Sequence, residues 1–329
     1  MTNIDYPLLF VPVYKDYLWG GDRISRKYGR GDTCKPCAES WEIADRAEGM
    51  SIVANGRLAG RTLGALVKEF GSRLTGTDSK GGRFPLLVKI IDAHLRLSVQ
   101  VHPADENAAE LRGEAKSEMW YVLSAKSGAR VFAGFKPDVN RKILAAAIKR
   151  KKFSGILEPI RVKASDAIMV EGGVVHCIDA GSLLLEVQQN SNTTYRVYDW
   201  DRAGADGKKR PLHVAEAVRA IIWGGQGETK TQRRLVSRES GNTVWDVLEC
   251  RHFHIERLDL SGPFQSCNNG SSFHAFFVVS GGVEIRTGRH SVRAQAGVSC
   301  LLPATVKKYA LLPMDGTAKV LRISLGRRG

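Results

Sequence analysis

The chain has 329 residues, of which 43% are apolar and 25% charged, a composition typical of globular proteins that excludes disorder as the main state. At ~100–200 residues per domain, this length predicts two domains. No stretch approaches the ~18 uncharged apolar residues of a membrane span, and Met1–Trp19 lacks the basic and apolar regions of a secretory signal. We therefore expect a soluble, cytoplasmic protein that makes no contact with a membrane.

The net charge is strongly positive, because 49 basic residues face 34 acidic ones and the excess is +15. Such a charge suits either nucleic acid or a phosphorylated small molecule. The densest basic cluster, Lys149–Lys152, is short, has no interleaved aromatic residues and follows a helical apolar pattern. It therefore resembles the solvated end of a helix, and we expect a phosphorylated substrate and no nucleic-acid partner.

Short strand-like runs separated by turn residues dominate the chain, which predicts a mainly β fold made of two jelly rolls. The expected strands are Leu86–Ile91, Leu97–Val101, Trp120–Leu123, Ala129–Ala133, Ala167–Val170, Leu183–Gln189, Tyr195–Tyr198, Val244–Cys250, His254–Leu260, His274–Ser280, Val283–Thr287, Val298–Leu302 and Ala318–Ile323. Helical periodicity predicts a few inserted helices, at Asp105–Lys116, Asp138–Lys149 with Asp138 as N-cap, and Pro211–Ile222.

A polar, Gly-rich segment divides the chain. We expect a metal-binding catalytic domain at 1–223, a linker at 224–243 and a C-terminal β domain at 244–329. A weak internal repeat supports two similar halves, because Ser165–Gly172 resembles Ala296–Pro303. The first copy leads to His176, whereas the second leads to Val306, Lys307 and Lys308, so we expect the C-terminal domain to lack metal ligands.

Six cysteines occur, and only Cys34 and Cys37 form a CxxC pair. A structural zinc site needs a second pair or histidines, and a redox motif would follow a strand and open a helix. Neither condition is met, so we expect reduced thiols.

The segment Ser98–Pro103 carries the most informative pattern. Residues two apart on a strand share a face, so Ser98, Gln100 and His102 project together. With Glu118 and His176 they could supply two imidazoles, a carboxylate and an amide oxygen to a divalent ion. This set suits zinc, although ligand types alone leave iron, cobalt, nickel and manganese open. Taken singly, each residue could instead be an ordinary surface or hydrogen-bonded side chain.

Charged residues in the neighbouring strands are further candidates. A hairpin about Asp179–Ser182 would bring Glu186 close to His176, as a partner of a ligand or a proton-transfer group. Lys89 is a charge inside an apolar strand and needs an anionic partner or a lowered pKa. Arg196 could stabilise an oxyanion and Arg202 could bind phosphate, but either could equally form a structural ion pair with a nearby aspartate.

Several motifs together resemble those of the type I phosphomannose isomerases (mannose-6-phosphate isomerases) of the short bacterial kind, in the cupin superfamily. The matching stretches cover the first two thirds of the chain in family order. They are Tyr17–Gly21, Glu39–Ile43, Phe84–Lys89, Ser98–Pro103, Glu118–Tyr121 and Gln188–Arg202. The last third is similar to the family only in its pattern of short strand-like runs separated by turn residues.

This resemblance implies two cupin-like jelly rolls and a zinc-dependent aldose–ketose isomerase with one zinc ion per chain. Residues matching the family's zinc ligands are Gln100, His102, Glu118 and His176. Arg196 matches the active-site arginine, and Ser98 and Arg202 match positions associated with the substrate phosphate. Pocket-lining positions are matched by Lys89, Glu42, Trp19 and Glu186. One departure is Glu171–Gly173 in place of a proline-containing turn, which we expect to loosen the placement of His176.

The implied reaction interconverts mannose 6-phosphate and fructose 6-phosphate through a cis-enediol, a step of carbohydrate metabolism. Glu186, Lys89 and Glu42 all remain possible general bases, and the sequence sets neither the range of phosphosugars nor the oligomeric state. Two alternatives stay open. One is a catalytically weak sugar-phosphate-binding or regulatory cupin, and the other is a non-haem Fe(II) cupin oxygenase, which a fourth protein ligand at Gln100 disfavours.

Overall fold

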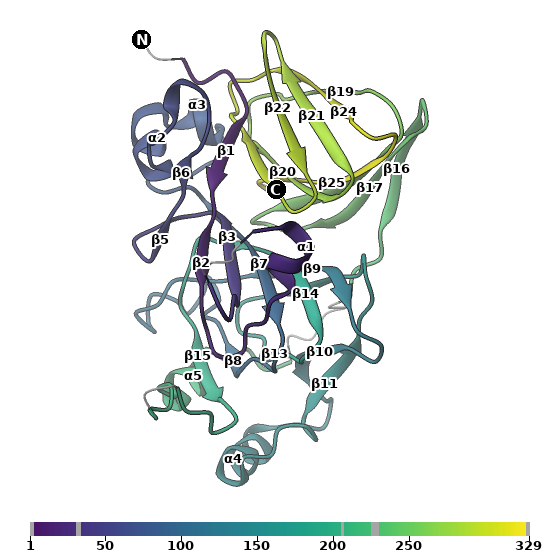
Figure 1. Ribbon diagram of the computed structural model, residues 1–329. Helices are drawn as coiled ribbons and strands as arrows, with labels where there is room; N and C mark the ends of the chain where they lie inside the picture. Colours follow the sequence, from purple (N-terminus) through teal and green to yellow (C-terminus); the bar gives the residue numbers. More distant parts are fainter. Residues whose placement is uncertain (1–2, 31–33, 205–206, 225–229, 327–329) are drawn as a thin grey trace. The chain divides into compact units, whose positions relative to one another are not determined.

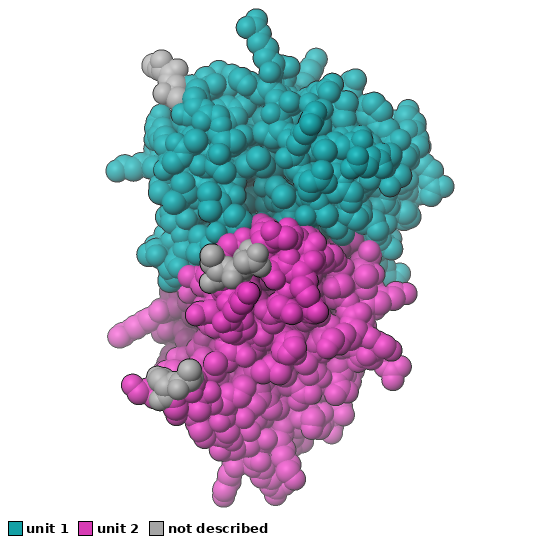
Figure 2. Space-filling model, in the orientation of Figure 1, with its two compact units in different colours: residues 1–13, 41–89, 232–329 teal, residues 14–40, 90–231 magenta. Residues whose placement is uncertain are grey.

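The structure is a computed structural model, and it describes residues 3–30, 34–204, 207–224 and 230–326. The chain separates into two compact units (Figure 2). Unit 1 comprises residues 1–13, 41–89 and 232–329, and unit 2 comprises residues 14–40 and 90–231. This division differs from the continuous domains we expected, because the first 89 residues contribute to both units.

The segment expected to be a linker, 224–243, is only partly described, since residues 225–229 lie outside the described residues. Its later part forms β16 (Arg234–Glu239), a strand of unit 1. The chain passes between the units at 231–232 and within β2 (Val13–Lys15), β3 (Glu39–Ile43) and β7 (Leu86–Ala93). The chain is 43% strand and 12% helix, which confirms the predicted mainly β fold.

Unit 2 contains two antiparallel sets of strands (Figure 1). One sheet has the order β11 (Leu157–Arg161), β10 (Arg130–Phe135), β13 (His176–Ile178), β8 (Val99–Val101) and β15 (Tyr195–Tyr198). The other set has the order β12 (Ala167–Val170), β9 (Glu118–Ala125) and β14 (Ser182–Gln189). Side chains of both sets, including Trp120 and Val131, belong to one buried cluster, so the two sets pack face to face.

Successive side chains of β8 point to opposite faces of its sheet, so only every second one lies between the two sets of strands. Val99 and Val101 are buried on the other face of their sheet, in a cluster with Leu144 of α4 (Arg141–Arg150) and Ala217 of α5 (Val214–Ala220). Gln100 therefore points toward the second set of strands. The predicted polar face of this strand is confirmed, and it lies inside the β sandwich.

Two of the three predicted helices exist, with shifted ends. α4 begins after Asn140, whose Oδ1 accepts hydrogen bonds from the amides of Lys142 and Ile143, so Asn140 and not Asp138 is the N-cap. α5 is shorter than predicted. The expected helix at 105–116 is wrong, because this segment forms successive turns and Arg112 has a positive φ of 52°. A short α1 (Arg23–Tyr28) also belongs to unit 2.

Unit 1 has the same two-sheet plan. Its larger sheet has the order β16, β17 (Asn242–Glu249), β18 (His254–Leu260), β25 (Ala318–Ser324), β20 (His274–Ser280), β23 (Ser299–Leu302), β1 (Leu8–Val11) and β6 (Ile52–Val53). Its smaller sheet has the order β19 (Phe264–Cys267), β24 (Lys308–Pro313), β21 (Gly282–Thr287) and β22 (His290–Gln295). Both sheets contribute to one apolar cluster that includes Phe276 and Leu311.

Small elements complete unit 1. They are β4 (Asp45–Arg46), β5 (Gly49–Met50), a 3-10 turn at Gly56–Leu58, α2 (Leu63–Phe70) and α3 (Ser72–Thr75). α2 begins at the N-cap Thr62, whose hydroxyl accepts a hydrogen bond from the amide of Ala65. Among the described residues, every helix is too short or too polar to cross a membrane.

Candidate metal centre

Three buried side chains converge between the two sets of strands of unit 2. His102 follows β8, Glu118 opens β9 and His176 opens β13 (Figure 1). Their candidate ligand atoms all lie within 4.8 Å of one another. Nε2 of His102 is 3.4 Å from Oε2 of Glu118, and Nε2 of His176 is 3.5 Å from Oε1. The structure thus brings together three of the four residues that the sequence suggested as ligands.

The fourth residue, Gln100, joins the cluster through strand register. His176 on β13 and Arg196 on β15 both pair directly with Gln100 on β8, so the three side chains form a row across one sheet. Nε2 of Gln100 is 3.1 Å from Nε2 of His176, and its Oε1 accepts a hydrogen bond of 2.9 Å from Oγ of Ser98. A rotation of the amide by half a turn would present Oε1 to the cluster.

Both imidazoles present a lone pair to this centre. Nδ1 of His102 lies 2.8 Å from the carbonyl oxygen of Thr193, and Nδ1 of His176 lies 2.8 Å from that of Val174. A carbonyl can only accept, so each Nδ1 carries the proton and each Nε2 is free to bind a cation. Burial, aided by the ammonium of Lys116, lowers the pKa of His102 to about 3, and burial also lowers the pKa of His176.

Glu118 is ionised although it is buried. Burial alone would raise its pKa, but the ammonium of Lys116 and the two imidazoles outweigh burial and hold the pKa well below its usual value. Nζ of Lys116 is 2.6 Å from Oε2 of Glu118 and 3.0 Å from Nε2 of His102. Despite this ion pair, neither carboxylate oxygen accepts a well-oriented hydrogen bond from the described residues.

These features fit a divalent metal. For bonds of about 2.0–2.1 Å, tetrahedral ligand atoms stand about 3.3–3.4 Å apart, close to the separations found here. Two imidazole lone pairs and a carboxylate without hydrogen bonds are the donors that zinc and related ions prefer. The ammonium of Lys116 lies 2.6 Å from the carboxylate of Glu118 and 3.8 Å from that of Glu186.

The sequence reading missed Lys116, because it placed this residue at the end of a helix. The useful signal was its position two residues before Glu118, which puts both side chains on the same side of an extended segment. Nζ of Lys116 also lies 3.8 Å from Oε1 of Glu186, so the ammonium connects the two carboxyl groups.

The predicted hairpin between the strands of His176 and Glu186 is wrong. β13 pairs with β10 and β8, whereas β14 pairs with β9, so Asp179–Ser182 carries the chain from one sheet to the other. Glu186 still approaches the centre, since it lies opposite Trp120 and its Oε2 accepts a hydrogen bond of 3.1 Å from the indole Nε1. The Trp120 ring in turn meets the His176 ring edge-on at 5.6 Å.

The two predicted arginines differ in their surroundings. Arg196 is partly buried, and its Nε is buried without a hydrogen-bond acceptor among the described residues. Arg202 donates to the carbonyl of Arg96 at 2.6 Å and to Oδ1 of Asp199 at 2.5 Å, while Arg210 grips the same carboxylate with two bonds. Arg202 therefore makes the ion pair that the sequence left open, whereas Nε of Arg196 has no acceptor among the described residues.

The other predicted site residues are also buried. Trp19 belongs to the apolar cluster of unit 2, and its ring lies 5.7 Å from that of Tyr17. Lys89 and Glu42 are buried in unit 1, where the Lys89 ammonium lies 5.9 Å from the centre of the Trp41 ring. The six cysteines are free, and burial raises the pKa of Cys37 to about 12, in line with the expected thiol state of the CxxC pair.

The turn before His176 is held by specific contacts. The amide of Gly172 donates to Oγ of Ser117 at 3.1 Å, and the amide of Gly173 donates to the carbonyl of His102 at 2.8 Å. Gly173 has a positive φ of 87°, and a Cβ on Gly172 would lie 2.6 Å from the backbone of Ala104. Two glycines therefore give a tightly packed turn that connects the segments of both histidines, in contrast to the looseness expected from the missing proline.

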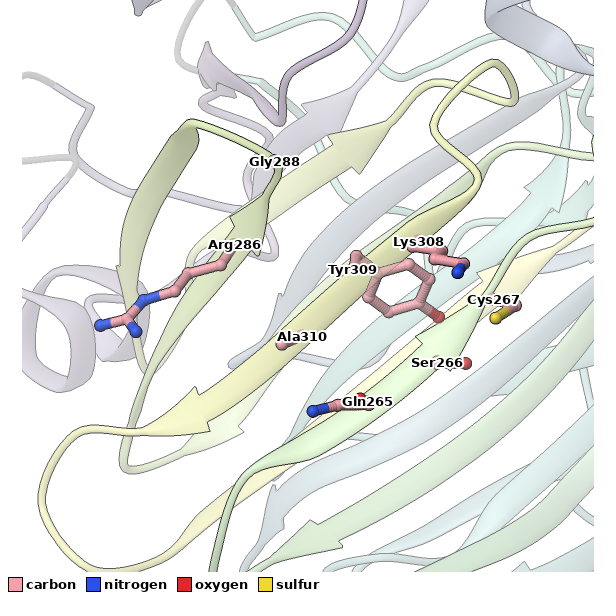
Figure 3. Close-up of a pocket in the computed structure, with 8 residues that line it drawn as sticks. All are labelled: Gln265, Ser266, Cys267, Arg286, Gly288, Lys308, Tyr309 and Ala310. Carbon is pink, nitrogen blue, oxygen red and sulfur yellow. The ribbon is translucent and has the colours of Figure 1, made fainter.

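Unit 1 carries a separate cavity of about 430 Å³ along β19 and β24 (Figure 3). Its lining includes Cys267, Lys308 and Arg286. Within the described ranges, His102, Glu118 and His176 form the only group of three or more His, Cys, Asp or Glu side chains arranged to hold a metal. The cavity of unit 1 is therefore not a second metal centre of this kind.

Comparison with known proteins agrees with this geometry. Residues 8–133 match the family model described as phosphomannose isomerase type I, catalytic domain, and residues 243–325 match the mannose-6-phosphate isomerase cupin domain. Mannose-6-phosphate isomerase ManA of Bacillus subtilis is 35% identical, with 93% of this chain and 95% of the relative covered. The mannose-6-phosphate isomerase of Streptococcus mutans is 33% identical, with 96% and 97% covered.

A solved structure of a mannose 6-phosphate isomerase from Bacillus subtilis superposes with a TM-score of 0.88 at 30% identity, and covers 97% of this chain and 99% of that one. The cupin-like fold predicted from the sequence is confirmed by this match and by the cupin-domain model. With the buried His–Glu–His cluster, these similarities over nearly the whole length lead to one assignment: the chain belongs to the type I phosphomannose isomerase family of enzymes.

Proposed function

We propose that the protein is a zinc-dependent mannose-6-phosphate isomerase that interconverts mannose 6-phosphate and fructose 6-phosphate through a cis-enediol. The observation that carries this proposal is the buried cluster of two neutral imidazoles and a carboxylate, in register with Arg196, whose Nε has no hydrogen-bond acceptor among the described residues. Relatives that this chain matches over more than nine tenths of its length are named for this activity.

His102, Glu118 and His176 would hold the metal, with Gln100 as the fourth ligand through its amide oxygen. The nitrogen and oxygen donors and their spacing favour zinc, with one ion per chain. A bound zinc ion would act as a Lewis acid on the oxygens of the sugar at C1 and C2.

Arg196 would stabilise negative charge that develops on these oxygens. It lies directly opposite Gln100 on the neighbouring strand and is partly exposed. A guanidinium that needs no reorientation during the reaction lowers the energy of an oxyanion more effectively than water does.

The proton moves between C2 and C1 on one face of the enediol, so one group can remove and return it. Glu186, Lys89 and Glu42 remain candidates for this base. Lys116 is a candidate for a different role, proton donation to the sugar oxygens, because its side chain is an ammonium that lies near both Glu118 and Glu186. We assign catalytic roles to Arg196, Lys89 and Glu186, and pocket-lining roles to Glu42 and Trp19.

Phosphate recognition falls to Ser98 and Arg202. Ser98 is buried beside Gln100, and Arg202 is anchored two residues upstream of Ser98 through the carbonyl of Arg96. Contacts with phosphate use binding energy remote from the reacting carbons to hold C1 and C2 in place. The substrate is thus a phosphosugar, which suits the positive net charge.

Phosphorus NMR tests the proposal. The purified protein is incubated with mannose 6-phosphate before chelation, after chelation and after zinc is restored. We expect a fructose 6-phosphate signal that chelation abolishes and zinc restores. An absence of conversion by zinc-loaded protein would reject the isomerase assignment and favour the binding-only alternative. Conversion that survives replacement of Gln100 by Ala would contradict the four-ligand centre.

A further inference from the structure

We propose that Trp200 is a positioning residue for the phosphate-binding pair Ser98 and Arg202, an inference that rests on the function proposed above. Trp200 lies in the loop after β15, between Arg196 and Arg202 in the chain. It touches the start of β8 rather than the metal cluster.

The backbone at this point is unusual. Trp200 has a φ of 59° and Asp201 a φ of 53°, both in the left-handed region that residues other than glycine rarely adopt. Two such residues in succession persist only where the surroundings hold them in place, and they reverse the chain so that Arg202 turns back toward β8.

The Trp200 side chain supplies the contacts that hold this turn. Its indole Nε1 donates a hydrogen bond of 2.7 Å to the carbonyl of Leu97. The guanidinium of Arg96 lies 4.7 Å from the centre of the Trp200 ring and is itself fixed by Asp179 through bonds of 2.7 and 2.9 Å. The ring is therefore held both at its edge and on its face.

These contacts attach the turn that carries Arg202 to the segment that leads into Ser98. Leu97 directly precedes Ser98, and Nη1 of Arg202 donates to the carbonyl of Arg96, the residue before Leu97. Trp200 and Arg202 thus grip two successive carbonyls at the start of β8. If the indole contact is lost, the turn can shift, and the distance between the Ser98 hydroxyl and the Arg202 guanidinium is no longer fixed.

Trp200 makes no hydrogen bond to His102, Glu118 or His176 within the part of the chain that the structure describes. Its removal should therefore weaken binding of the phosphate without changing the reaction at C1 and C2. In kinetic terms, the Michaelis constant for mannose 6-phosphate rises while kcat is retained.

The test compares Trp200→Phe with Trp245→Phe. Phenylalanine keeps an aromatic face for Arg96 and removes only the indole donor. Trp245 is a matched control, since its Nε1 also donates one hydrogen bond, to Asp259 at 2.9 Å, but in unit 1. For Trp200→Phe we expect KM to rise about tenfold, kcat to stay within about twofold and the inhibition constant of inorganic phosphate to rise in parallel with KM.

A second variant guards against misfolding of the first. Arg96→Lys keeps the charge but cannot make the two-bond contact with Asp179 or stack as flatly on the indole, so we expect a KM increase of about two- to fourfold. Unchanged KM and phosphate inhibition in both variants, or a loss of kcat alone, would overturn the inference. If the unmodified zinc-loaded protein did not convert mannose 6-phosphate at all, the proposed function itself would fail.

Discussion

Unit 1 and unit 2 are each built from two packed sheets, which we call a barrel below. The two barrels share a strand plan, but the side chains at their centres differ in charge and hydrogen bonding. In unit 2, Glu118 opens β9 and pairs with Val170 on β12. In unit 1, His274 opens β20 and pairs with Leu302 on β23. Ser165 and Gly297, both with positive φ, stand two residues before β12 and β23. Aligned on these turns, Val170 corresponds to Leu302 and His274 takes the place of Glu118, so the repeat suggested by the sequence is shifted by one residue.

Strand pairing also shows which other residues of unit 1 correspond to residues of the metal centre in unit 2. Trp120 pairs with Glu186 on one side of β9, and Phe276 pairs with Arg322 on the same side of β20. Arg322 therefore takes the place of Glu186, and a cation replaces an anion. Where His176 pairs with Gln100 in unit 2, Tyr309 pairs with Ser266 in unit 1.

The centre of unit 1 is closed by its own hydrogen bonds. Arg322 donates to Oη of Tyr309 at 2.9 Å, to Oγ of Ser266 at 3.0 Å and to Glu256 at 2.7 Å. The Tyr309 hydroxyl, which accepts from Arg322, lies 2.9 Å from Nδ1 of His274 and donates to it. Lone pairs that would face a metal are thus used by protein donors.

The comparison teaches that the fold alone does not make a metal centre. In unit 2 neither Glu118 oxygen accepts a well-oriented hydrogen bond from the described residues, and the two imidazole nitrogens lie 3.0 Å from the Lys116 ammonium and 3.1 Å from the Gln100 amide. In unit 1 the Arg322 guanidinium donates to the acceptors around it. The bare carboxylate therefore suits unit 2 to bind a further cation, whereas Arg322 already uses the acceptors of unit 1.

The largest difference between the barrels should appear in activity. We expect His176→Ala to lower kcat/KM by about a thousandfold and to lose bound zinc, because a ligand and its charge stabilisation are removed. His274→Asn, in unit 1, should leave kcat/KM and the zinc content within about twofold of those of the unmodified protein. Steady-state kinetics and metal analysis check this, and equal losses in the two variants would contradict the assignment.

The second largest effect concerns stability, and here the sensitive residue lies in unit 1. Arg322 and Glu256 are mostly buried, with 13% and 14% of their side chains exposed. Arg322→Met leaves Glu256 without its guanidinium, and we expect the free energy of unfolding to fall by about 3 kcal/mol while the activity of folded molecules is retained.

The matched control for this variant is Arg286→Met, which breaks an exposed pair with Glu284 and should cost less than about 0.5 kcal/mol. Urea unfolding provides both values. A loss at Arg322 no larger than that at Arg286 would show that the guanidinium does not hold the second centre together.

Acid should weaken both barrels of the metal-free protein. Burial, followed by the charges of Arg322 and His254, lowers the pKa of His274 to about 3, the same value as for His102. Between pH 6.5 and 3 the unfolded chain binds protons that the folded chain excludes. The stabilisation is therefore complete above pH 6.5 and is lost on acidification, at about 1.4 kcal/mol per pH unit for each histidine.

His274→Asn should remove one such contribution, so that its unfolding free energy falls less steeply from pH 6 to 4 than that of the unmodified protein. Zinc should oppose the acid effect through His102 and His176, and not through His274. Identical slopes for the variant and the unmodified protein would contradict a buried, neutral His274.

The smallest effect compares two serines, one beside each centre. After the amide rotation that presents Oε1 of Gln100 to the metal, Oγ of Ser98 can accept a hydrogen bond from Nε2; Ser98→Ala removes this acceptor, and we expect zinc affinity to fall about tenfold in a competition with a chelating dye. Ser266→Ala removes one acceptor of Arg322 and should leave zinc affinity unchanged. Equal zinc affinities of the two variants would mean that Ser98 does not orient Gln100.

Much of the site follows from local sequence rules. Alternation along Ser98–His102 predicted a shared polar face, and the structure shows it as the row through Gln100. The family motifs then joined Glu118 and His176 to that face across a wide sequence separation.

The predictions that the structure contradicts depend on contacts between residues far apart in the sequence. Nothing in Asp179–Ser182 distinguishes a hairpin from a link between two sheets, because both need the same tight turn. The apolar spacing of 105–116 imitates a helix, but the amides of this segment are used in turns that pack beside His102. The interleaving of residues 1–89 between the units depends on contacts with strands more than a hundred residues away, to which local patterns are insensitive.

The most direct test of the account is a zinc titration of the chelated protein, followed by the conversion of mannose 6-phosphate to fructose 6-phosphate in phosphorus NMR. The two unlike centres predict a rate that rises linearly and reaches its plateau at one zinc ion per chain. A plateau at two ions per chain, or zinc binding without conversion, would contradict the claim that unit 2 alone carries an isomerase metal centre.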